Sequence, residues 1–233
     1  MSLLEIKDLT IRYGKKLAVD HVSWSIGPGF HALLGPNGAG KTSLMSSIAT
    51  LLRPTSGSIT IDGREGKDIR KSLGYCPQDN LRKSSFTVAQ HLEYMCWLRC
   101  LPSDRVASEV SRILSLTSLA DCSGQKIKTL SGGTRRRVAI GSALIGQPSL
   151  VILDEPSAGL DIGQRDSLST ILSSVAEQAI TIVSTHLVED IIDHASTITV
   201  MNNGRFCFDG RFEDFSTSRN LDDVRDSYLE IVS

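Results

Sequence analysis

Long apolar runs are missing from this chain of 233 residues. Its longest apolar stretches, such as Ile140 to Ile145, are far shorter than the roughly 20 residues that a transmembrane helix needs. The first ten residues include acidic ones and lack a basic segment that leads into an apolar one, which is unlike a secretory signal or a transit peptide. We therefore expect a cytoplasmic protein that does not span a membrane alone.

A large charge imbalance and a cysteine framework are also absent. The net charge is −1 and charged residues make up 22% of the chain, which favours neither a disordered protein nor a basic one, so we expect no nucleic-acid partner. The five cysteines are scattered and odd in number, without the paired spacing of a zinc site. Cys96 and Cys100 lie one helical turn apart but have no histidine close in sequence, so we interpret all five as small apolar residues.

The apolar pattern predicts a single α/β domain spanning residues 1–233, with no internal repeat. Strands are expected within 3–34 and at 58–61, 151–153, 180–184 and 198–201, and helices at 41–52, 103–116 and 221–231. Between 87 and 120 strand patterns vanish and apolar residues recur at helical spacing. We therefore predict a parallel sheet flanked by helices, with an inserted helical subdomain at about 87–146.

A glycine-rich segment between a predicted strand and a predicted helix matches the phosphate-loop pattern G-x-x-x-x-G-K-[ST]. Its residues are Gly35, Pro36, Asn37, Gly38, Ala39, Gly40, Lys41 and Thr42. Glycines let the backbone curl so that its N–H groups and the helix N-terminus converge on phosphates. We expect Lys41 to bring positive charge to the β- and γ-phosphates of a nucleotide, Thr42 to be a ligand of Mg²⁺, and Ser43 to lie beside the nucleotide.

Two acidic residues follow the apolar strand at 150–153. Asp154 and Glu155 should lie at the carboxyl edge of the sheet, where the phosphate loop also opens. Because neighbouring strand residues point to opposite sides, the two acids should differ in role. We expect Asp154 to act on Mg²⁺ and Glu155 to be the general base for the attacking water, although acids at a strand end also serve as caps of the next turn.

The segment Leu130-Ser131-Gly132-Gly133-Thr134 separates one phosphate-loop family from the others. It resembles the signature L-S-G-G-Q of the ATP-binding-cassette (ABC) family, and the resemblance covers nearly the whole chain. Thr134 stands where the family usually has glutamine, and we expect a small effect from that change. The resemblance implies a phosphate-loop NTPase fold: a mixed β-sheet flanked by helices, an antiparallel β subdomain and an inserted α-helical subdomain that carries the signature.

The same resemblance assigns roles to residues that spacing alone does not explain. Gln78 matches the family's Q-loop, which contacts the nucleotide and Mg²⁺, and residues 157–161 match its D-loop. His186 matches the switch histidine, a sensor of the γ-phosphate that orients the attacking water, although a lone histidine is more often structural. Tyr13 matches the aromatic residue that stacks on adenine, with core packing as the alternative.

In this family the signature of one subunit faces the phosphate loop of another. Ser131, Gly132 and Gly133 are therefore implied to bind the γ-phosphate in a second chain, and a helix start after Ser-Gly-Gly, expected at Thr134, suits anion binding. The active state would be a homodimer, or a heterodimer with a related cassette, closed around two MgATP. We interpret the neighbouring run of three arginines at 135–137 as a solvated helix face.

The resemblance implies an ATPase subunit that powers transport through a separate membrane permease, on the inner face of the membrane. Residues 131–137 and 184–191 resemble ATPases of ABC-2-type exporters, which favours export. Tyr94, Met95 and Trp97 would receive the permease, or else pack in the core. The alternatives are a soluble ABC ATPase acting on ribosomes or DNA, which usually has a second cassette or a coiled coil, and a regulator without enzymatic activity.

Overall fold

The computed structural model describes residues 2–78, 81 and 84–232. Its strands are β1 (Leu4–Tyr13), β2 (Lys16–Ile26), β3 (Gly29–Leu34), β4 (Ser56–Ile61), β5 (Arg64–Glu65), β6 (Leu73–Cys76), β7 (Leu150–Asp154), β8 (Ile180–Thr185), β9 (Thr197–Asn202) and β10 (Arg205–Arg211). Its α-helices are α1 (Lys41–Ile48), α2 (Val88–Leu98), α3 (Ser103–Leu116), α4 (Gly132–Leu144), α5 (Ile162–Ala176), α6 (Phe212–Phe215) and α7 (Leu221–Val232). Short 3-10 turns include η1 (Gly66–Ser72) and η4 (Val188–Asp190).

The strands form two sheets, as the resemblance implied. Four of them make an antiparallel sheet in the order β2-β1-β4-β5, and six make a mixed sheet in the order β10-β9-β3-β8-β7-β6. Strands β9, β3, β8, β7 and β6 run parallel to one another, and only the edge strand β10 is antiparallel. The parallel strands bring the carboxyl ends of β3, β7 and β8 to one edge of the mixed sheet, where a ligand site is expected.

Alternating side chains of the buried strand β7 belong to two different cores. Leu150 and Ile152 pack in the cluster that includes α1 and the antiparallel sheet. Val151 and Leu153 point the other way, into the cluster that includes the helices α2 to α5. The strand is therefore apolar on both faces because each face is covered, which is typical of a parallel sheet.

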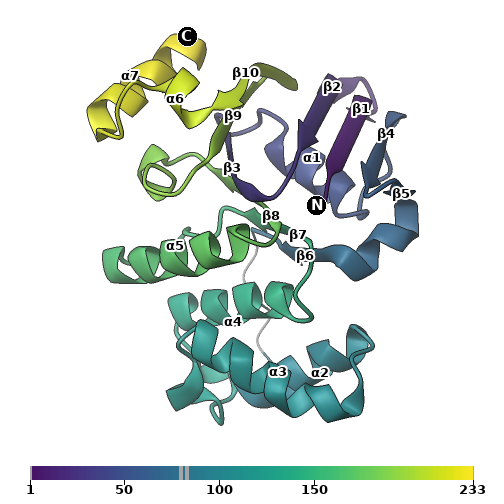
Figure 1. The fold of residues 1–233 in the computed structure, drawn as a ribbon, viewed down its shortest axis with the longest axis vertical. Helices are drawn as coiled ribbons and strands as arrows, with labels where there is room; N and C mark the ends of the chain where they lie inside the picture. Colours follow the sequence, from purple (N-terminus) through teal and green to yellow (C-terminus); the bar gives the residue numbers. More distant parts are fainter. Residues whose placement is uncertain (1, 79–80, 82–83, 233) are drawn as a thin grey trace.

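Helices α2, α3 and α4 lie together on one side of the mixed sheet, far from β1 and β2 (Figure 1). We call these three helices the helical group. Helix α2 begins with a capping box, in which Thr87 accepts from the backbone of Gln90 and the Gln90 side chain accepts from the backbone of Thr87. Helix α4 packs on β6 and β7, so it joins the helical group to the mixed sheet.

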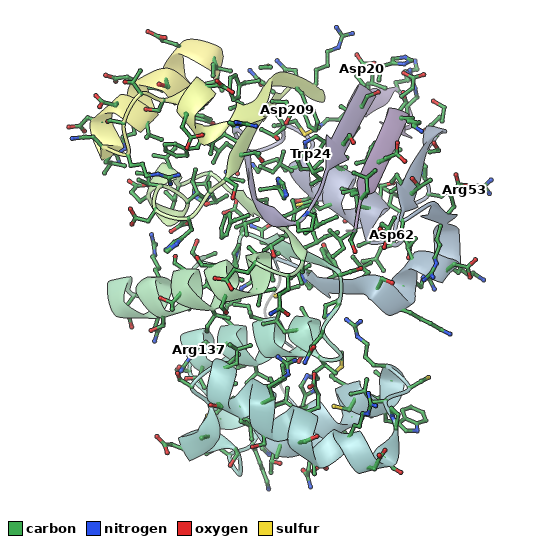
Figure 2. All side chains as sticks on the ribbon, viewed as in Figure 1. Asp20, Trp24, Arg53, Asp62, Arg137 and Asp209 are labelled. Carbon is green, nitrogen blue, oxygen red and sulfur yellow. The ribbon has the colours of Figure 1, made fainter. Side chains whose placement is uncertain are left out.

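The two sheets are joined near the phosphate loop. Trp24 of β2 donates from Nε1 to Oδ1 of Asp209 in β10, at 3.0 Å (Figure 2). In the turn between β9 and β10, the N–H of Gly204 donates to the carbonyl of Ala39 at 2.9 Å. The carbonyl of Gly204 in turn accepts from the N–H of Asp20 at 2.8 Å. This turn therefore supports the phosphate loop from the side of the antiparallel sheet.

The observed helices differ in length from some predictions. The first helix ends at Ile48 rather than near Leu52, because Thr50 adopts a left-handed conformation with φ of 59° that stops the helix. Across the described part of the chain, no helix combines the length and the apolar character that crossing a bilayer requires.

His31 is a titratable side chain buried in the core, with both ring nitrogens hydrogen-bonded. Because the Gly27 carbonyl can only accept, Nε2 of His31 donates to it at 2.7 Å, and Nδ1 of the neutral ring accepts from the Thr197 hydroxyl at 2.8 Å. Burial lowers the pKa of His31, against smaller opposing effects of the Gly27 hydrogen bond and Asp209. The folded state therefore binds this proton less readily than the unfolded state does.

We predict that His31 makes the protein less stable in mild acid. As the pH falls through about 6.5, the unfolded chain takes up the proton first, so the free energy of unfolding decreases, by at most about 1.4 kcal/mol per pH unit for one proton. Urea unfolding from pH 8 to 5 should show a shallower decrease in His31→Gln than in the wild type. Comparison at pH 8, where histidine is neutral, isolates the packing cost of the substitution, and identical slopes in acid would contradict the prediction.

Candidate active site

The phosphate loop connects β3 to α1, and two of its glycines are required by close backbone contacts. Gly35 has φ of 153°, and a Cβ there would lie 2.1 Å from the carbonyl oxygen of Met201. Gly40 has φ of 110°, and its Cβ would lie 2.2 Å from the carbonyl oxygen of Ala18. No acidic residue occupies the first turn of α1, so its N–H groups and partial positive charge are available to an anion.

Lys41, the first residue of α1, is 6% exposed. Its Nζ donates to the carbonyl oxygens of Gly35 at 2.6 Å and Pro36 at 3.3 Å, which holds the ammonium group inside the loop. Burial lowers the pKa of Lys41, whereas the nearby carboxylates of Glu155 and Asp154 raise it. The loop thus places a buried positive charge where a phosphate would bind.

Asp154 ends β7 and is 1% exposed. Its Oδ1 accepts from the hydroxyl of Ser184 on β8 at 2.5 Å, whereas Oδ2 is buried with no hydrogen-bond partner among the described residues. A buried carboxylate oxygen without a partner is costly unless something else satisfies it. A divalent cation such as Mg²⁺ fits this oxygen, because hard cations prefer oxygen ligands.

Glu155 follows β7 with φ of 49°, in the left-handed region, which is uncommon for a residue with a side chain. Its N–H is shared between the carbonyl oxygen of Ser184 at 3.1 Å and the Ser184 hydroxyl at 3.0 Å. Its Oε2 accepts from Nδ1 of His186 at 2.8 Å. The side chain of His186 is 48% exposed and that of Glu155 only 7%, so the carboxylate is buried beneath an accessible imidazole.

A cleft of about 250 Å³ opens over the phosphate loop. Its walls include residues 37–43 of the loop and α1, together with Tyr13, Gln78 and Glu155, all of which the sequence analysis named. Tyr13 is 51% exposed, so the alternative that it packs in the core is wrong. Its hydroxyl accepts from Ser43 at 3.5 Å. Lys16 also lines the cleft, although no pattern in the sequence marked it.

The signature segment lies elsewhere. Ser131, Gly132 and Gly133 are not among the residues that line this cleft. Ser131 and Gly132 are exposed, and the Ser131 hydroxyl accepts from the backbone N–H of Thr134 at 3.2 Å. Helix α4 therefore begins at Gly132, two residues before the predicted start, because Ser131 caps it. Ser131 and Gly132 are therefore accessible to another molecule, whereas Gly133 is buried.

Sequence reasoning missed two polar residues that hydrogen-bond the candidate site, Ser184 and Asp190. Ser184 hydrogen-bonds both Asp154 and the backbone of Glu155, and it lies two residues before His186, within a motif that was already known. Asp190 accepts from Thr185 at 3.0 Å and from the hydroxyl of Ser157 in the D-loop. These contacts connect the ends of β7 and β8 to the loops that follow them.

The run of three arginines was misinterpreted. Arg136 is only 1% exposed, so the prediction of a solvated face at 135–137 is wrong for this residue. Helix α4 packs on β6 and β7, and the direction of the Arg136 side chain follows from that packing. Arg136 donates to backbone carbonyls at the ends of β6 and β7, whereas Arg137 contacts the carbonyls of Thr117 and Ser118 near α3.

Comparison with known proteins identifies the family. The family model described as ABC transporter matches residues 19–158, which contain the phosphate loop, the signature, Asp154 and Glu155. The chain belongs to the ABC transporter family. It has the ATPase fold of that family, which confirms the resemblance that the sequence indicated.

Curated relatives include proteins with different transport roles. The chain is 32% identical over 208 residues to the sulfate/thiosulfate import ATP-binding protein CysA of Mycolicibacterium paratuberculosis, covering 87% of this chain and 58% of that protein. It is 37% identical over 176 residues to human phospholipid-transporting ATPase ABCA3, covering 74% of this chain and 10% of that protein. The chain thus spans a little over half of the first relative and a small part of the second.

Solved structures agree over nearly the full chain. A structure described as the ATP-binding subunit of an ABC transporter matches with a TM-score of 0.88 and 25% identity, covering 98% of this chain and 99% of that one. The structure of cbiO1 from Clostridium perfringens, described as part of the ABC transporter complex cbiONQ, matches with a TM-score of 0.80 and 28% identity, covering 91% and 89%. The predicted preference for export gains no support from these names, since CysA is named for import.

We predict that Glu155→Gln binds ATP as the wild type does but hydrolyses it about 100- to 10,000-fold more slowly. The amide keeps the shape of the carboxylate and removes its capacity to accept a proton from water. Calorimetric binding of ATP and release of inorganic phosphate measure the two properties separately. A variant with wild-type turnover would overturn the role of Glu155 as the base.

Proposed function

We propose that this chain is the motor subunit of a membrane transporter, in which ATP binding closes two cassettes and hydrolysis reopens them. The observation that carries the proposal is the convergence of the phosphate loop, Asp154 and the Glu155–His186 pair at one edge of the mixed sheet. The exposed signature helix start, which lies outside that cleft, supports a site completed by a second chain.

The residues of the candidate site have separate roles in this mechanism. Lys41 and the N–H groups at the start of α1 bind and neutralise the β- and γ-phosphates, and Tyr13 supports the adenine ring. Glu155 accepts a proton from the attacking water, while His186 holds the carboxylate in place and senses the γ-phosphate.

The residues present also fit a magnesium ion. Thr42, Asp154 and, from the Q-loop, Gln78 would hold Mg²⁺, and the unsatisfied Oδ2 of Asp154 supports that assignment. Bound there, Mg²⁺ supplies positive charge that offsets the charge developing on the phosphate oxygens. The short hydrogen bond from Ser184 fixes the Asp154 carboxylate in one orientation, as expected of a supporting residue behind a metal ligand.

A second chain would complete each site. At the N-terminus of α4, Ser131 and Gly132 are exposed, and the Ser131 hydroxyl and the N–H of Gly132 suit a phosphate oxygen, whereas Gly133 is buried beside the Gln164 side chain. In a symmetric head-to-tail pair, each signature would face the phosphate loop of the partner, so that two ATP molecules bind between the chains. The proposal covers a homodimer or a pairing with a related cassette.

We predict that two inactive variants restore activity when they are mixed. Lys41→Ala disables the phosphate loop and Ser131→Arg blocks the signature, so each alone should lose ATPase activity. A mixed dimer has one site with both defects and one site with none, which should return about a quarter of wild-type activity under random pairing. Phosphate release from each variant and from the mixture measures this. Absence of any recovery would contradict the composite site.

The permease would dock on the helical group. Tyr94 and Trp97 of α2 are 45% and 69% exposed, and their rings stack with centroids 5.9 Å apart. Phe86 meets Tyr94 edge to ring at 6.0 Å, so three aromatic side chains form one exposed patch. Met95, in contrast, packs partly buried against the core. Clustered exposed aromatics are typical of an interface, which supports docking of a separate membrane subunit at the inner face of the membrane.

We propose export as the direction, based on the resemblance of residues 131–137 and 184–191 to ABC-2-type exporters. A phospholipid is one candidate cargo, since relatives from human, mouse and rat are named phospholipid-transporting ATPase ABCA3. The named importer CysA makes sulfate the competing candidate.

We predict that Trp97→Ser leaves the ATPase activity of the isolated chain unchanged but weakens its co-purification with the permease. Leu51→Ser is the matched control, because Leu51 is 68% exposed but lies far from α2 in sequence. Inside-out vesicles of the intact complex should then accumulate labelled phospholipid when ATP is added, and Trp97→Ser should reduce this accumulation. Sulfate efflux from preloaded vesicles would instead indicate import, and equal co-purification of both variants would contradict docking on the aromatic patch.

A further inference from the structure

Arg136 is one turn into α4, and all five of its N–H donors bind backbone carbonyls. Nε donates to Pro156 at 3.1 Å, and Nη1 donates to Pro77 at 2.6 Å and Gln78 at 3.2 Å. Nη2 donates to Asp154 at 2.6 Å and Glu155 at 2.9 Å. A guanidinium group has five N–H donors, so these five carbonyls match it completely.

The five carbonyls belong to two separate segments of the site. Pro77 and Gln78 follow β6 and begin the Q-loop, whereas residues 154–156 end β7 and include the metal ligand and the general base. Because the acceptors are main-chain atoms, Arg136 fixes the backbone from which the side chains of Gln78, Asp154 and Glu155 project. That backbone includes the left-handed conformation of Glu155, which tolerates little displacement.

Arg136 also lies one helical turn after the signature glycine Gly132. The N-terminus of α4 is the part of this chain that would contact ATP held by a partner chain. A rigid helix therefore connects the signature to Arg136, and Arg136 connects it to the catalytic backbone of the same chain. Gly132 and Arg136 are thus separated by only one turn of the same helix.

We propose that Arg136 is a positioning residue that couples the signature helix to the general base. When α4 moves to engage the nucleotide of a partner chain, Arg136 carries the ends of β6 and β7 with it and sets the position of Glu155 and Gln78. The inference rests on the function proposed above, and it adds a residue to which neither the family signature nor the cleft assigns a role.

The neighbouring arginines show that the arrangement is specific to Arg136. Arg137 donates to the carbonyls of Thr117 and Ser118, beside α3 of the helical group. Arg135 donates to the carbonyl of Leu130 just before its own helix. Neither contacts the ends of β6 or β7 through these bonds, so Arg137→Gln is a matched control with the same chemistry on the same helix.

The test compares ATP binding with turnover in Arg136→Gln, Arg136→Lys and Arg137→Gln. We expect Arg136→Gln to bind ATP with an affinity within about twofold of the wild type, because the phosphate loop is intact, while kcat falls on the order of 100-fold through misplacement of the base. Arg136→Lys keeps the charge and three donors, so it should restore part of kcat. Arg137→Gln should keep kcat within about twofold.

Thermal unfolding of each variant separates positioning from stability. If Arg136→Gln lowers Tm but keeps kcat at a temperature where it is folded, Arg136 is only structural and the proposal is wrong. If Arg136→Gln does not fold, Arg136→Lys decides the question: a reduced kcat with unchanged ATP affinity supports the proposal, and wild-type kcat overturns it. A wild-type chain without ATPase activity would instead overturn the proposed function.

A distance measurement tests the coupling itself. Cys100 at the end of α2 and Cys207 on β10 are exposed, whereas Cys76 and Cys96 are buried, so spin labels can be placed in a Cys122→Ser background. We expect ATP to shift the distance distribution between the labels in an otherwise wild-type chain. With Arg136→Gln the distribution should broaden and respond less to ATP, and an unchanged response would overturn the coupling.

Discussion

The structure depends on satisfying four charged groups that are buried where the central parallel strands end. Lys41, Arg136, Asp154 and Glu155 are each less than 10% exposed, and an unpaired charge in such a place costs several kcal/mol. Each of the four groups has hydrogen-bond partners within the site. Loop carbonyls hold Lys41, five main-chain carbonyls hold Arg136, Ser184 holds Asp154 and His186 holds Glu155. Oδ2 of Asp154 has no hydrogen-bond partner among the described residues, which is the reason for proposing that a cation binds there.

These partners come from elements that are distant in sequence, which explains why the whole fold is needed for the site. Register within the mixed sheet places Asp154 beside Ser184, and β3 beside β8, so the loops after these strands meet. The turn at Gly204 and the contact of Trp24 with Asp209 fix the antiparallel sheet against the phosphate loop. Tyr13, at the end of β1, thereby reaches the cleft although it lies outside the central sheet.

Sequence predicted the parts of the site that depend on short-range geometry. The phosphate loop at 35–42 and the acids after β7 are readable because a strand, a loop and a helix start follow one another along the chain. The predicted helix at 41–52 was too long because Thr50 turns left-handed, a conformation that apolar spacing does not reveal. Arg136 could not be found this way. Three consecutive arginines point about 100° apart around a helix, and packing of α4 on β6 and β7 decides which one is buried.

The burial of Arg136 is better explained by coupling than by stability alone. Apolar side chains of similar volume often replace buried ions without loss of stability, so a guanidinium is not needed merely to fill space between α4 and the sheet. A guanidinium is suited to fixing backbone positions, because its planar set of N–H donors binds several carbonyls at once and fixes their relative positions. Those carbonyls belong to the two segments that carry Glu155, the proposed base, and Gln78. In the proposed dimer, the N-terminus of α4 faces the nucleotide of the partner chain, and Arg136, one turn later, binds the backbone of Asp154 and Glu155. Contact with the partner would thereby align this chain's own site.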